Sequence, residues 1–247
     1  MYCPDPAHNG QAAAGHENRF AVIIPVYNHG LTVENVIIES LKLGLPVFVV
    51  DDGSTDDTYE RIKKLTPIHI LRHSKNIGKG AALMTGFTEA ARIADWAVTF
   101  DADGQHNPGD ATALTRVAEK SGRALIVGRR TGMDNPHVKW TSRFGRKFSN
   151  FWVRVCGGPA ISDSQSGFRL YPLPEALAWG VKARRFEFEV EVLVRAHRKG
   201  VPVIEAPVGV KYLPPGERIS HFRPWVDFFR NAKTFTRLLA IRFFLRS

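Results

Sequence analysis

The sequence is poor in cysteine and has no long apolar run. Its two cysteines, Cys3 and Cys156, lie far apart and have no metal-ligand spacing around them. This favours free thiols and a reducing compartment over a disulfide framework. No stretch reaches the ~20 consecutive apolar residues of a membrane span, and the first 19 residues lack the apolar core of a signal peptide. We therefore expect a cytoplasmic protein with a disordered N-terminal extension over residues 1–19.

Acidic residues are outnumbered, and the excess of positive charge is uneven. The 247 residues include 34 Lys or Arg and 24 Asp or Glu, and residues 211–247 alone hold eight basic and two acidic side chains. Such a segment suits nucleic acid, an anionic membrane surface or a phosphorylated substrate, and it also suits an ordinary solvated helix face. The sequence has no zinc-finger or RNP-like signature. A basic nucleic-acid-binding module is therefore kept only as the alternative from another functional class.

What is present is an alternation of strand and helix patterns, in a chain with 44% hydrophobic residues. Apolar and β-branched runs predict strands at residues 20–26, 47–50, 68–71, 96–100 and 124–128. Helical spacing predicts helices at residues 31–43 and 57–65 and another that ends near residue 93. This alternation is typical of βαβ units. We expect one α/β domain over residues 20–213, with a mostly parallel central sheet and helices on both of its faces.

Polar residues follow three of the predicted strands. They occupy residues 25–28, 51–54 and 101–105. In an open α/β sheet, ligands bind at the carboxyl ends of parallel strands, so these three segments should meet at one edge. A single such loop has an ordinary explanation in helix capping, but three together indicate a ligand site.

The third segment, DADGQ, places oxygen ligands at alternate positions: Asp101, Asp103 and Gln105. Mg²⁺ and Mn²⁺ prefer oxygen ligands, and Mg²⁺ is commonly held by one or two carboxylates together with substrate phosphates. The loop lacks the later ligands and closing glutamate of an EF-hand. The spacing therefore predicts a site for Mg²⁺ or Mn²⁺ with a diphosphate.

Five segments occur in an order that resembles a known family. They are IIPVYN at 23–28, VVDDGSTDDT at 49–58, NIGKGAAL at 76–83, DADGQH at 101–106 and DSQSGFRLY at 163–171. Together they resemble the family 2 glycosyltransferases with a GT-A fold, a Rossmann-like nucleotide-sugar-binding fold. Within that family they are most similar to the dolichyl- or polyprenyl-phosphate sugar synthases, which include dolichol-phosphate mannosyltransferases. The resemblance covers roughly residues 20–212.

The resemblance implies an inverting, metal-dependent transfer from a nucleotide-diphosphate sugar, GDP-mannose or a UDP-hexose, to a polyprenyl- or dolichyl-type lipid phosphate. It implies that the base and ribose are held by Pro25, Tyr27, Asn28, Asp51 and Asp52. Lys79 would help to bind the donor, and Asp101, Asp103 and Gln105 would hold the metal on its diphosphate. His29 departs from the family, which often has glutamate after the Tyr-Asn pair, so the nucleotide stays open.

The acceptor side is expected beyond the acidic loop, where residues 139–154 contain five basic residues and no acidic one. Arg143 and Lys147 have the i, i+4 spacing of one helical face. Arginine can pair two phosphate oxygens at once, and an ionised phosphate needs positioning more than it needs a base. By resemblance, Arg129 and Arg143 are the first candidates for acceptor contacts, followed by Lys147 and Arg130.

The segment DSQSGFRLY adds Asp163, Gln165 and Arg169 to the acceptor side, again by resemblance. If the acceptor were a saccharide or lipid hydroxyl, Asp163 could serve as general base; with a phosphate acceptor it would orient groups. Both acceptor classes stay open. The residues expected to act in catalysis are Asp103, Asp163 and Arg129.

Two C-terminal patterns are ambiguous. Residues 186–200 begin with strand-like alternation and continue with helical spacing, and we expect a helix from about Glu187 because the family has one there. Residues 214–247 form a basic amphipathic segment. Such a segment suits a membrane interface, with peripheral attachment to the cytoplasmic face, and equally suits packing on the domain or on a neighbouring subunit. The oligomeric state is left open.

Overall fold

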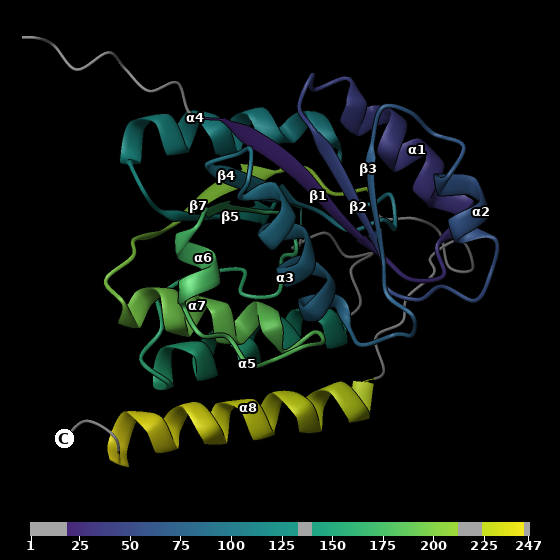
Figure 1. Ribbon diagram of the computed structural model, residues 1–247. Helices are drawn as coiled ribbons and strands as arrows, with labels where there is room; N and C mark the ends of the chain where they lie inside the picture. Colours follow the sequence, from purple (N-terminus) through teal and green to yellow (C-terminus); the bar gives the residue numbers. More distant parts are fainter. Residues whose placement is uncertain (1–18, 133–139, 212–223, 245–247) are drawn as a thin grey trace, which may run out of the picture.

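A seven-stranded sheet organises the protein, seen here in a computed structural model that describes residues 19–132, 140–211 and 224–244 (Figure 1). The strands are β1 (Phe20–Val26), β2 (Val47–Asp51), β3 (His69–Arg72), β4 (Trp96–Thr99), β5 (Leu125–Arg130), β6 (Arg169–Pro172) and β7 (Val203–Val208). Their order in the sheet is β3-β2-β1-β4-β6-β5-β7. All neighbours are parallel except β6, which runs antiparallel to both β4 and β5. The expectation of a mostly parallel α/β sheet is confirmed.

Helices cover both faces of this sheet (Figure 1). They are α1 (Gly30–Leu41), α2 (Thr58–Ile62), α3 (Lys79–Ala90), the 3₁₀ turn η1 (Pro108–Asp110), α4 (Ala111–Ser121), α5 (Trp140–Val155), α6 (Glu175–Ala178), α7 (Phe188–Arg198) and α8 (Pro224–Phe244). Side chains of α1, α2 and α4 share one apolar core, and those of α3, α5, α6, α7 and α8 share the other. The sheet lies between the two cores.

Close packing of α3 on the sheet explains the glycine at position 86 of this helix. A Cβ on Gly86 would lie only 2.5 Å from Cγ2 of Ile23 in β1. On the same face, Phe87 packs against Tyr171 with ring centroids 4.7 Å apart. The helix can therefore approach the sheet closely, and its first residue, Lys79, is held at the carboxyl edge.

The five predicted strands correspond to β1–β5, whereas β6, β7 and α4 were not predicted. β6 has only four residues and includes a proline, so it carries little of the strand signal on which the prediction rested. The expected helix after residue 187 is confirmed as α7. Its strand-like alternation arises because the helix is buried on every side, including at Glu189 and Glu191.

The described part of the C-terminal segment, residues 224–244, forms one helix, α8, that packs on the domain. Phe235 and Leu238 are buried, and Phe235 stacks on Trp152 of α5 with centroids 6.1 Å apart. Nη2 of Arg198 donates to the carbonyl oxygens of Leu238 (2.8 Å) and Cys156 (2.6 Å). Cys156 is itself fully buried. Within residues 19–132, 140–211 and 224–244, no helix has the length and apolarity of a membrane span.

Candidate functional site

The loops after β1 and β2 lock together at the carboxyl edge of the sheet. Asn28 has a left-handed backbone (φ 52°), which asparagine tolerates better than most residues. Its N–H donates to Oγ of Ser54 (3.0 Å), and its Oδ1 accepts from the N–H of Thr55 (2.8 Å). Asp51 is fully buried, accepts from the N–H of Ser54 (2.9 Å) and lies 3.0 Å from Nε of Arg72. The first two polar segments are thus brought together.

The other predicted donor residues of these segments lie beside this contact. Pro25 is buried within β1, in register with Val50 of β2, and Tyr27 follows the strand and is half-buried. Their expected contacts with base and ribose stay predictions.

Asp52 holds the loop that leads into α3. Its Oδ1 accepts from the N–H of Ile77 (3.0 Å) and lies 2.7 Å from Nδ1 of His73, and its Oδ2 accepts from the N–H of Gly78 (2.7 Å). The side chain is almost completely buried. Asp52 thereby fixes the backbone of Gly78 and helps to place the residue after it, Lys79, at the carboxyl edge.

Lys79 joins two carboxylates at the centre of the site. Its Nζ lies 2.6 Å from Oδ1 of Asp101 and also contacts Oε1 of Glu189, with the side chains of Lys79 and Glu189 only 13% and 9% exposed. Burial disfavours the charge of Lys79, but the two carboxylates outweigh it and raise the pKa of the amine. Burial likewise opposes ionisation of Asp101, and Lys79 outweighs it and lowers the pKa of that carboxyl.

Gly167 lies directly against this cluster, where only a residue without a side chain fits. A Cβ at this position would lie 2.7 Å from Nζ of Lys79 and 2.9 Å from Oδ2 of Asp101. The segment DSQSGFRLY therefore approaches the donor side through its glycine. The sequence pattern identified Lys79 and Asp101, but not Glu189. The signal for Glu189 was an acidic side chain among the apolar residues at the start of α7, a signal that Glu191 shares.

The loop after β4 carries the remaining predicted metal ligands. The N–H of Gln105 donates to Oδ1 of Asp103 (3.1 Å). Gln105 is 7% exposed, and its Nε2 is buried without a hydrogen-bond partner among the described residues. Among all the residues that the structure describes, no three His, Cys, Asp or Glu side chains lie close enough together to form a metal site by themselves. The carboxylate oxygens of this loop fit a divalent cation, and the unpaired Nε2 of Gln105, a hydrogen-bond donor, fits an oxygen of the diphosphate that would arrive with it.

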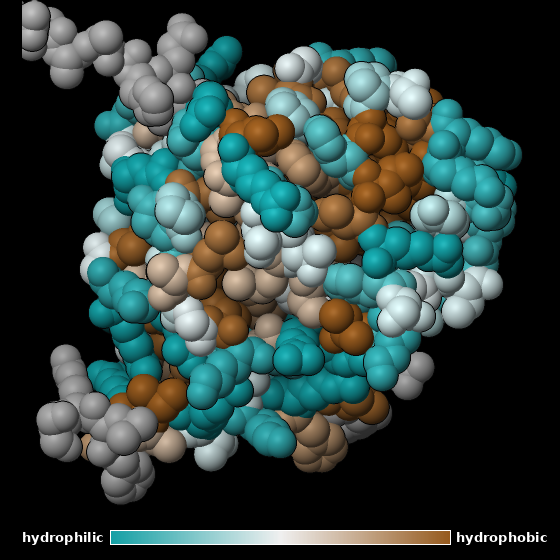
Figure 2. All heavy atoms as spheres, in the orientation of Figure 1, coloured by the Kyte–Doolittle hydropathy of each residue, from teal (hydrophilic) through white to brown (hydrophobic). Residues whose placement is uncertain are grey.

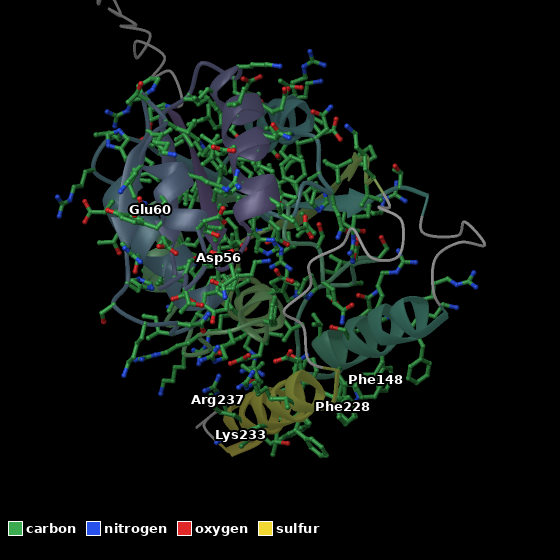
Figure 3. All side chains as sticks on the ribbon, turned by 90° about the vertical axis from the view of Figure 1, so that its right-hand side faces the viewer. Asp56, Glu60, Phe148, Phe228, Lys233 and Arg237 are labelled. Atoms are coloured by element: carbon green, nitrogen blue, oxygen red, sulfur yellow. The ribbon has the colours of Figure 1, made fainter. Side chains whose placement is uncertain are left out.

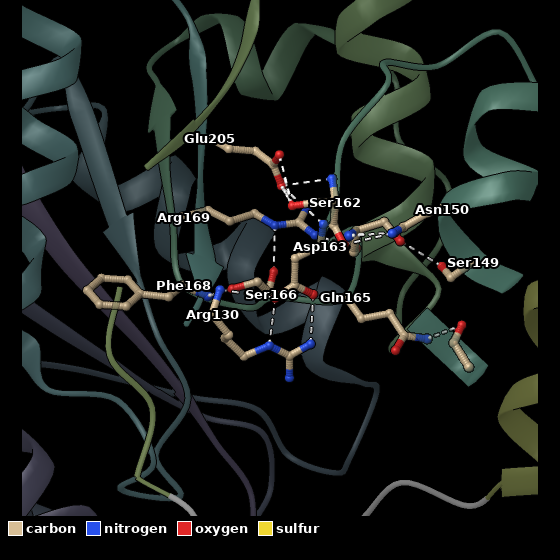
Figure 4. Close-up of polar contacts among 12 residues, drawn as sticks. Arg130, Ser149, Asn150, Ser162, Asp163, Gln165, Ser166, Phe168, Arg169 and Glu205 are labelled. Carbon is tan, nitrogen blue, oxygen red and sulfur yellow. Dashed lines mark hydrogen bonds and ion pairs between the residues drawn. The ribbon is translucent and has the colours of Figure 1, made fainter. Parts of the chain in front are cut away.

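A second cluster surrounds Asp163 (Figure 4). The fully buried carboxylate accepts from Nη2 and Nε of Arg130, each at 2.8 Å. Burial raises the pKa of Asp163, but the hydrogen bonds and charge of Arg130 outweigh it, so the pKa lies below its ordinary value. Glu205 of β7 accepts from the N–H groups of Ser162 (2.9 Å) and Asp163 (3.0 Å). Glu205 was missed because β7 was not predicted.

Arg169 lies beneath this loop. Its guanidinium is fully buried and donates to the carbonyl oxygens of Ser164 (2.8 Å), Ser166 (2.7 Å) and Glu189 (2.8 Å). In this arrangement Arg169 supports the loop instead of facing an acceptor, and through Glu189 it ties the loop to α7. Gln165 is half-buried, with its Nε2 3.5 Å from the carbonyl oxygen of Gly145 in α5.

The other predicted acceptor residues are more accessible. Arg129 is exposed at the end of β5, Lys147 is exposed on α5, and Arg143 on the same helix is half-buried. None of the three forms an ion pair with another described residue. Arg130, in contrast, forms an ion pair with Asp163. Their contacts with an acceptor stay predictions.

The Arg130–Asp163 pair should make folding stability depend on acid pH. Since the folded pKa of Asp163 is depressed, its contribution is present above the unfolded pKa of about 3.9 and is lost as pH falls through the folded pKa. Asp163→Asn should reduce the slope of unfolding free energy against pH in that acid range by up to about 1.4 kcal/mol per pH unit. Urea denaturation between pH 5 and pH 2 measures this, and an unchanged slope would contradict it.

Comparisons with known proteins agree with this geometry. The model of the family described as Glycosyl transferase family 2 matches residues 21–172. The UDP-N-acetylglucosamine–dolichyl-phosphate N-acetylglucosaminyltransferase of Methanococcus voltae is 30% identical over 215 residues, which cover 77% of this chain and 85% of that protein. The undecaprenyl-phosphate mannosyltransferase of Micrococcus luteus is 29% identical over 210 residues, covering 77% and 82%.

A solved structure extends the likeness to the fold. Glucosyl-3-phosphoglycerate synthase from Mycobacterium tuberculosis, crystallised with Mn²⁺, UDP and phosphoglyceric acid, aligns with a TM-score of 0.67 at 20% identity over 92% of this chain and 78% of that one. The GT-A type of fold is thereby confirmed. Because the family model covers more than half of the sequence, the chain belongs to glycosyltransferase family 2, and it is a glycosyltransferase related to the polyprenyl-phosphate sugar transferases.

Proposed function

We propose that the protein transfers a sugar, with inversion, from a nucleotide-diphosphate sugar to a polyprenyl-type lipid phosphate. The observation that carries the proposal is a pair of polar groups. The first is the ion-paired Lys79 and Asp101 at the carboxyl edge, with Asp103 in the same loop as Asp101, and the second is the accessible Arg129 and Arg143 on the segments that follow. One group suits a diphosphate and its metal, and the other suits a second phosphate.

The chemistry requires one bond to form as another breaks. An oxygen of the lipid phosphate attacks the anomeric carbon, and the bond from that carbon to the diphosphate oxygen is broken, so the nucleoside diphosphate leaves with the electron pair. Mg²⁺ or Mn²⁺ held by Asp101, Asp103 and Gln105 would stabilise the charge that develops on the leaving diphosphate. The first two polar segments would position the nucleoside, and Lys79 would orient Asp101 through their ion pair.

The state of Asp163 supports a phosphate acceptor over a hydroxyl. A hydroxyl acceptor needs a general base with a free oxygen in reach of the proton. Asp163 is fully buried, both of its oxygens accept from Arg130, and its pKa is depressed, which makes it a poor proton acceptor. An ionised phosphate needs no base, and Asp163 can then act by orienting Arg130.

The test is incubation with labelled GDP-mannose, UDP-glucose and UDP-N-acetylglucosamine in the presence of either polyprenyl phosphate or the matching polyprenol. We expect labelled lipid with one of the donors and only with the phosphate. Label on the polyprenol would contradict the acceptor assignment. No lipid-linked product with either acceptor from any donor would contradict the proposed function.

The acceptor residues give a second prediction. Arg129→Ala and Arg143→Ala should each raise the KM for the lipid phosphate, because each removes a charge-assisted hydrogen bond, by roughly tenfold or more. The KM for the donor should change little. Steady-state kinetics with one substrate varied at a time separates the two, and an equal rise in the donor KM would place these arginines on the donor side. Lys120→Ala, a change at an exposed residue of α4, is the control.

We further propose that the protein meets its lipid by docking on a membrane surface through an aromatic ridge formed by Phe144, Phe148, Phe151, Phe228 and Phe229. Six of the nine exposed large hydrophobic residues in the described chain lie on α5 or α8. The rings continue from one helix to the other, since Phe148 and Phe228 lie 5.6 Å apart (Figure 3). Along the lower edge of Figure 2, where α8 lies, the face turned to the viewer mixes hydrophilic and apolar residues and is not the face that carries these rings. A ridge of rings among basic residues suits a membrane interface.

Deleting α8 would not test this docking cleanly, because Phe235 and Leu238 belong to the core. Phe151→Ser with Phe229→Ser changes two rings of the ridge that are 60% and 67% exposed. This variant should keep its melting temperature, lose most co-sedimentation with liposomes and transfer more slowly to a long-chain lipid than to a short, water-soluble analogue. Ile38→Ser with Ile93→Ser changes exposed apolar residues elsewhere and should have no such effect. Unchanged liposome binding in the first variant would refute the ridge.

A further inference from the structure

A cavity of about 280 Å³ lies between α8 and the segment that precedes α7, away from the donor and acceptor residues described above. Six of its lining residues bear on what it can bind: Lys182, Glu187, Arg230, Lys233, Thr234 and Arg237. Figure 3 places Lys233 and Arg237 on the side of α8 away from Phe148 and Phe228. The cavity is therefore distinct from the aromatic ridge.

Positive charges converge on this cavity from two segments of the chain. Arg230, Lys233 and Arg237 recur at spacings of three and four residues and so share one face of α8. Lys182 reaches the cavity from the opposite wall. Glu187 is the one carboxylate among the lining residues, so the lining itself has four basic groups against one acidic group.

Part of this charge is already compensated behind the cavity. Nη1 of Arg230 lies 2.9 Å from Oδ1 of Asp227, and Nη2 of Arg237 lies 2.5 Å from Oε2 of Glu191. Lys182 and Lys233 form no ion pair with another described residue. Nε of Arg237 is buried and lacks a hydrogen-bond partner in the part of the chain that the structure describes. A buried donor without a partner is unusual. Oε2 of Glu187 in the same lining is also buried without a partner among the described residues, so the cavity has one unpaired acceptor beside its donors.

We propose that this cavity is a second anion site that binds a phosphate group. Guanidinium and ammonium groups supply charge-assisted hydrogen bonds to phosphate oxygens, and the hydroxyl of Thr234 adds a neutral donor. The phosphate belongs either to a free small molecule or to the headgroup of an anionic phospholipid, since α8 also carries part of the aromatic ridge. A short chain of contacts connects the cavity with α3: Glu191 also accepts from the N–H of Ala183 (2.8 Å), and the carbonyl oxygen of the next residue, Arg184, accepts from the N–H of Ala81 (2.9 Å).

The test compares three double variants at constant ionic strength. Lys182→Ala with Lys233→Ala removes the two unpaired charges, Lys182→Arg with Lys233→Arg keeps them, and Lys64→Ala with Lys120→Ala makes the same change of net charge at exposed sites elsewhere. One arm titrates inorganic phosphate against the thermal unfolding midpoint. The other measures co-sedimentation with phosphatidylglycerol vesicles and with phosphatidylcholine vesicles.

If the ligand is a free phosphate, the alanine pair at 182 and 233 should raise the half-saturating phosphate concentration by about tenfold, and the other two variants should not. If it is a headgroup, the same variant alone should lose binding to phosphatidylglycerol vesicles, and phosphatidylcholine vesicles should show no difference. The proposal is overturned if the alanine pair behaves like the wild type in both arms, or if the control at 64 and 120 loses as much. Neither arm uses sugar transfer, so the result is independent of the proposed function.

Discussion

Asp103→Asn is expected to reduce sugar transfer by about 10²–10³-fold while the protein stays folded. The substitution keeps the size of the side chain but removes one of the two carboxylates of the loop after β4. Asp103 is half-buried, and its carboxylate accepts from the N–H of Gln105, a bond that asparagine can retain. The loss should therefore come from weaker stabilisation of the leaving diphosphate, not from unfolding.

Three measurements separate these causes. The melting temperature should be unchanged within about 2 °C, since surface substitutions usually change stability by less than ~0.5 kcal/mol. Chelation should abolish transfer by the wild type, and added Mg²⁺ or Mn²⁺ should restore it. Glu119→Gln, which neutralises an exposed carboxylate on α4, is the matched control and should be fully active. Full wild-type activity in excess chelator would refute the metal dependence.

The donor half of the site could be predicted because its chemistry follows directly after strands. Asp51, Asp52 and Asp101 each come at the carboxyl end of a buried parallel strand, so the strand pattern and the fold class together place them at one edge. The sequence does not say which of them faces a ligand. Asp52 looks identical to Asp51 in the motif, yet its oxygens hold the loop before α3.

The acceptor half was less predictable because its residues depend on strands with weak signals. β6 runs against its neighbours and places Arg169 inward, where its donors meet backbone carbonyl oxygens. Glu189 and Glu205 reach the two clusters from α7 and β7, far from either motif in the sequence. Spacing rules describe neighbours along the chain, so they could not predict contacts between residues more than 40 positions apart.

The C-terminal helix shows the same limit. Its pattern of aromatic and basic residues is amphipathic, but the pattern does not say whether an apolar side chain faces the protein core or a membrane. The structure separates the two, since Phe235 and Leu238 are buried against α5 and α7, whereas Phe229 and Phe243 are exposed. Packing on the domain therefore accounts for one face of the helix, and membrane docking stays a proposal for the other.

Lys79→Met is expected to have the second large effect, because it leaves two carboxylates close together in a mostly buried place. Asp101 and Glu189 both contact the Lys79 amine, and breaking a buried ion pair by removing one partner costs about 3–5 kcal/mol. In a domain of this size the unfolding midpoint should fall by roughly 10 °C. Transfer should also be lost, since Asp101 would no longer be held in place beside the diphosphate.

Glu189→Gln tests whether stability and activity depend on the same contact. Alone, Glu189→Gln should lower the unfolding midpoint less than Lys79→Met does, because the Lys79 and Asp101 pair persists and glutamine can still accept a hydrogen bond from the amine. Combined with Lys79→Met, it removes the uncompensated charge and should recover part of the lost stability, whereas transfer should stay absent. Thermal unfolding and initial rates on the two single variants and the double variant complete the cycle. If the double variant regains activity together with stability, Lys79 serves the fold alone, and its place in the donor site would have to be abandoned.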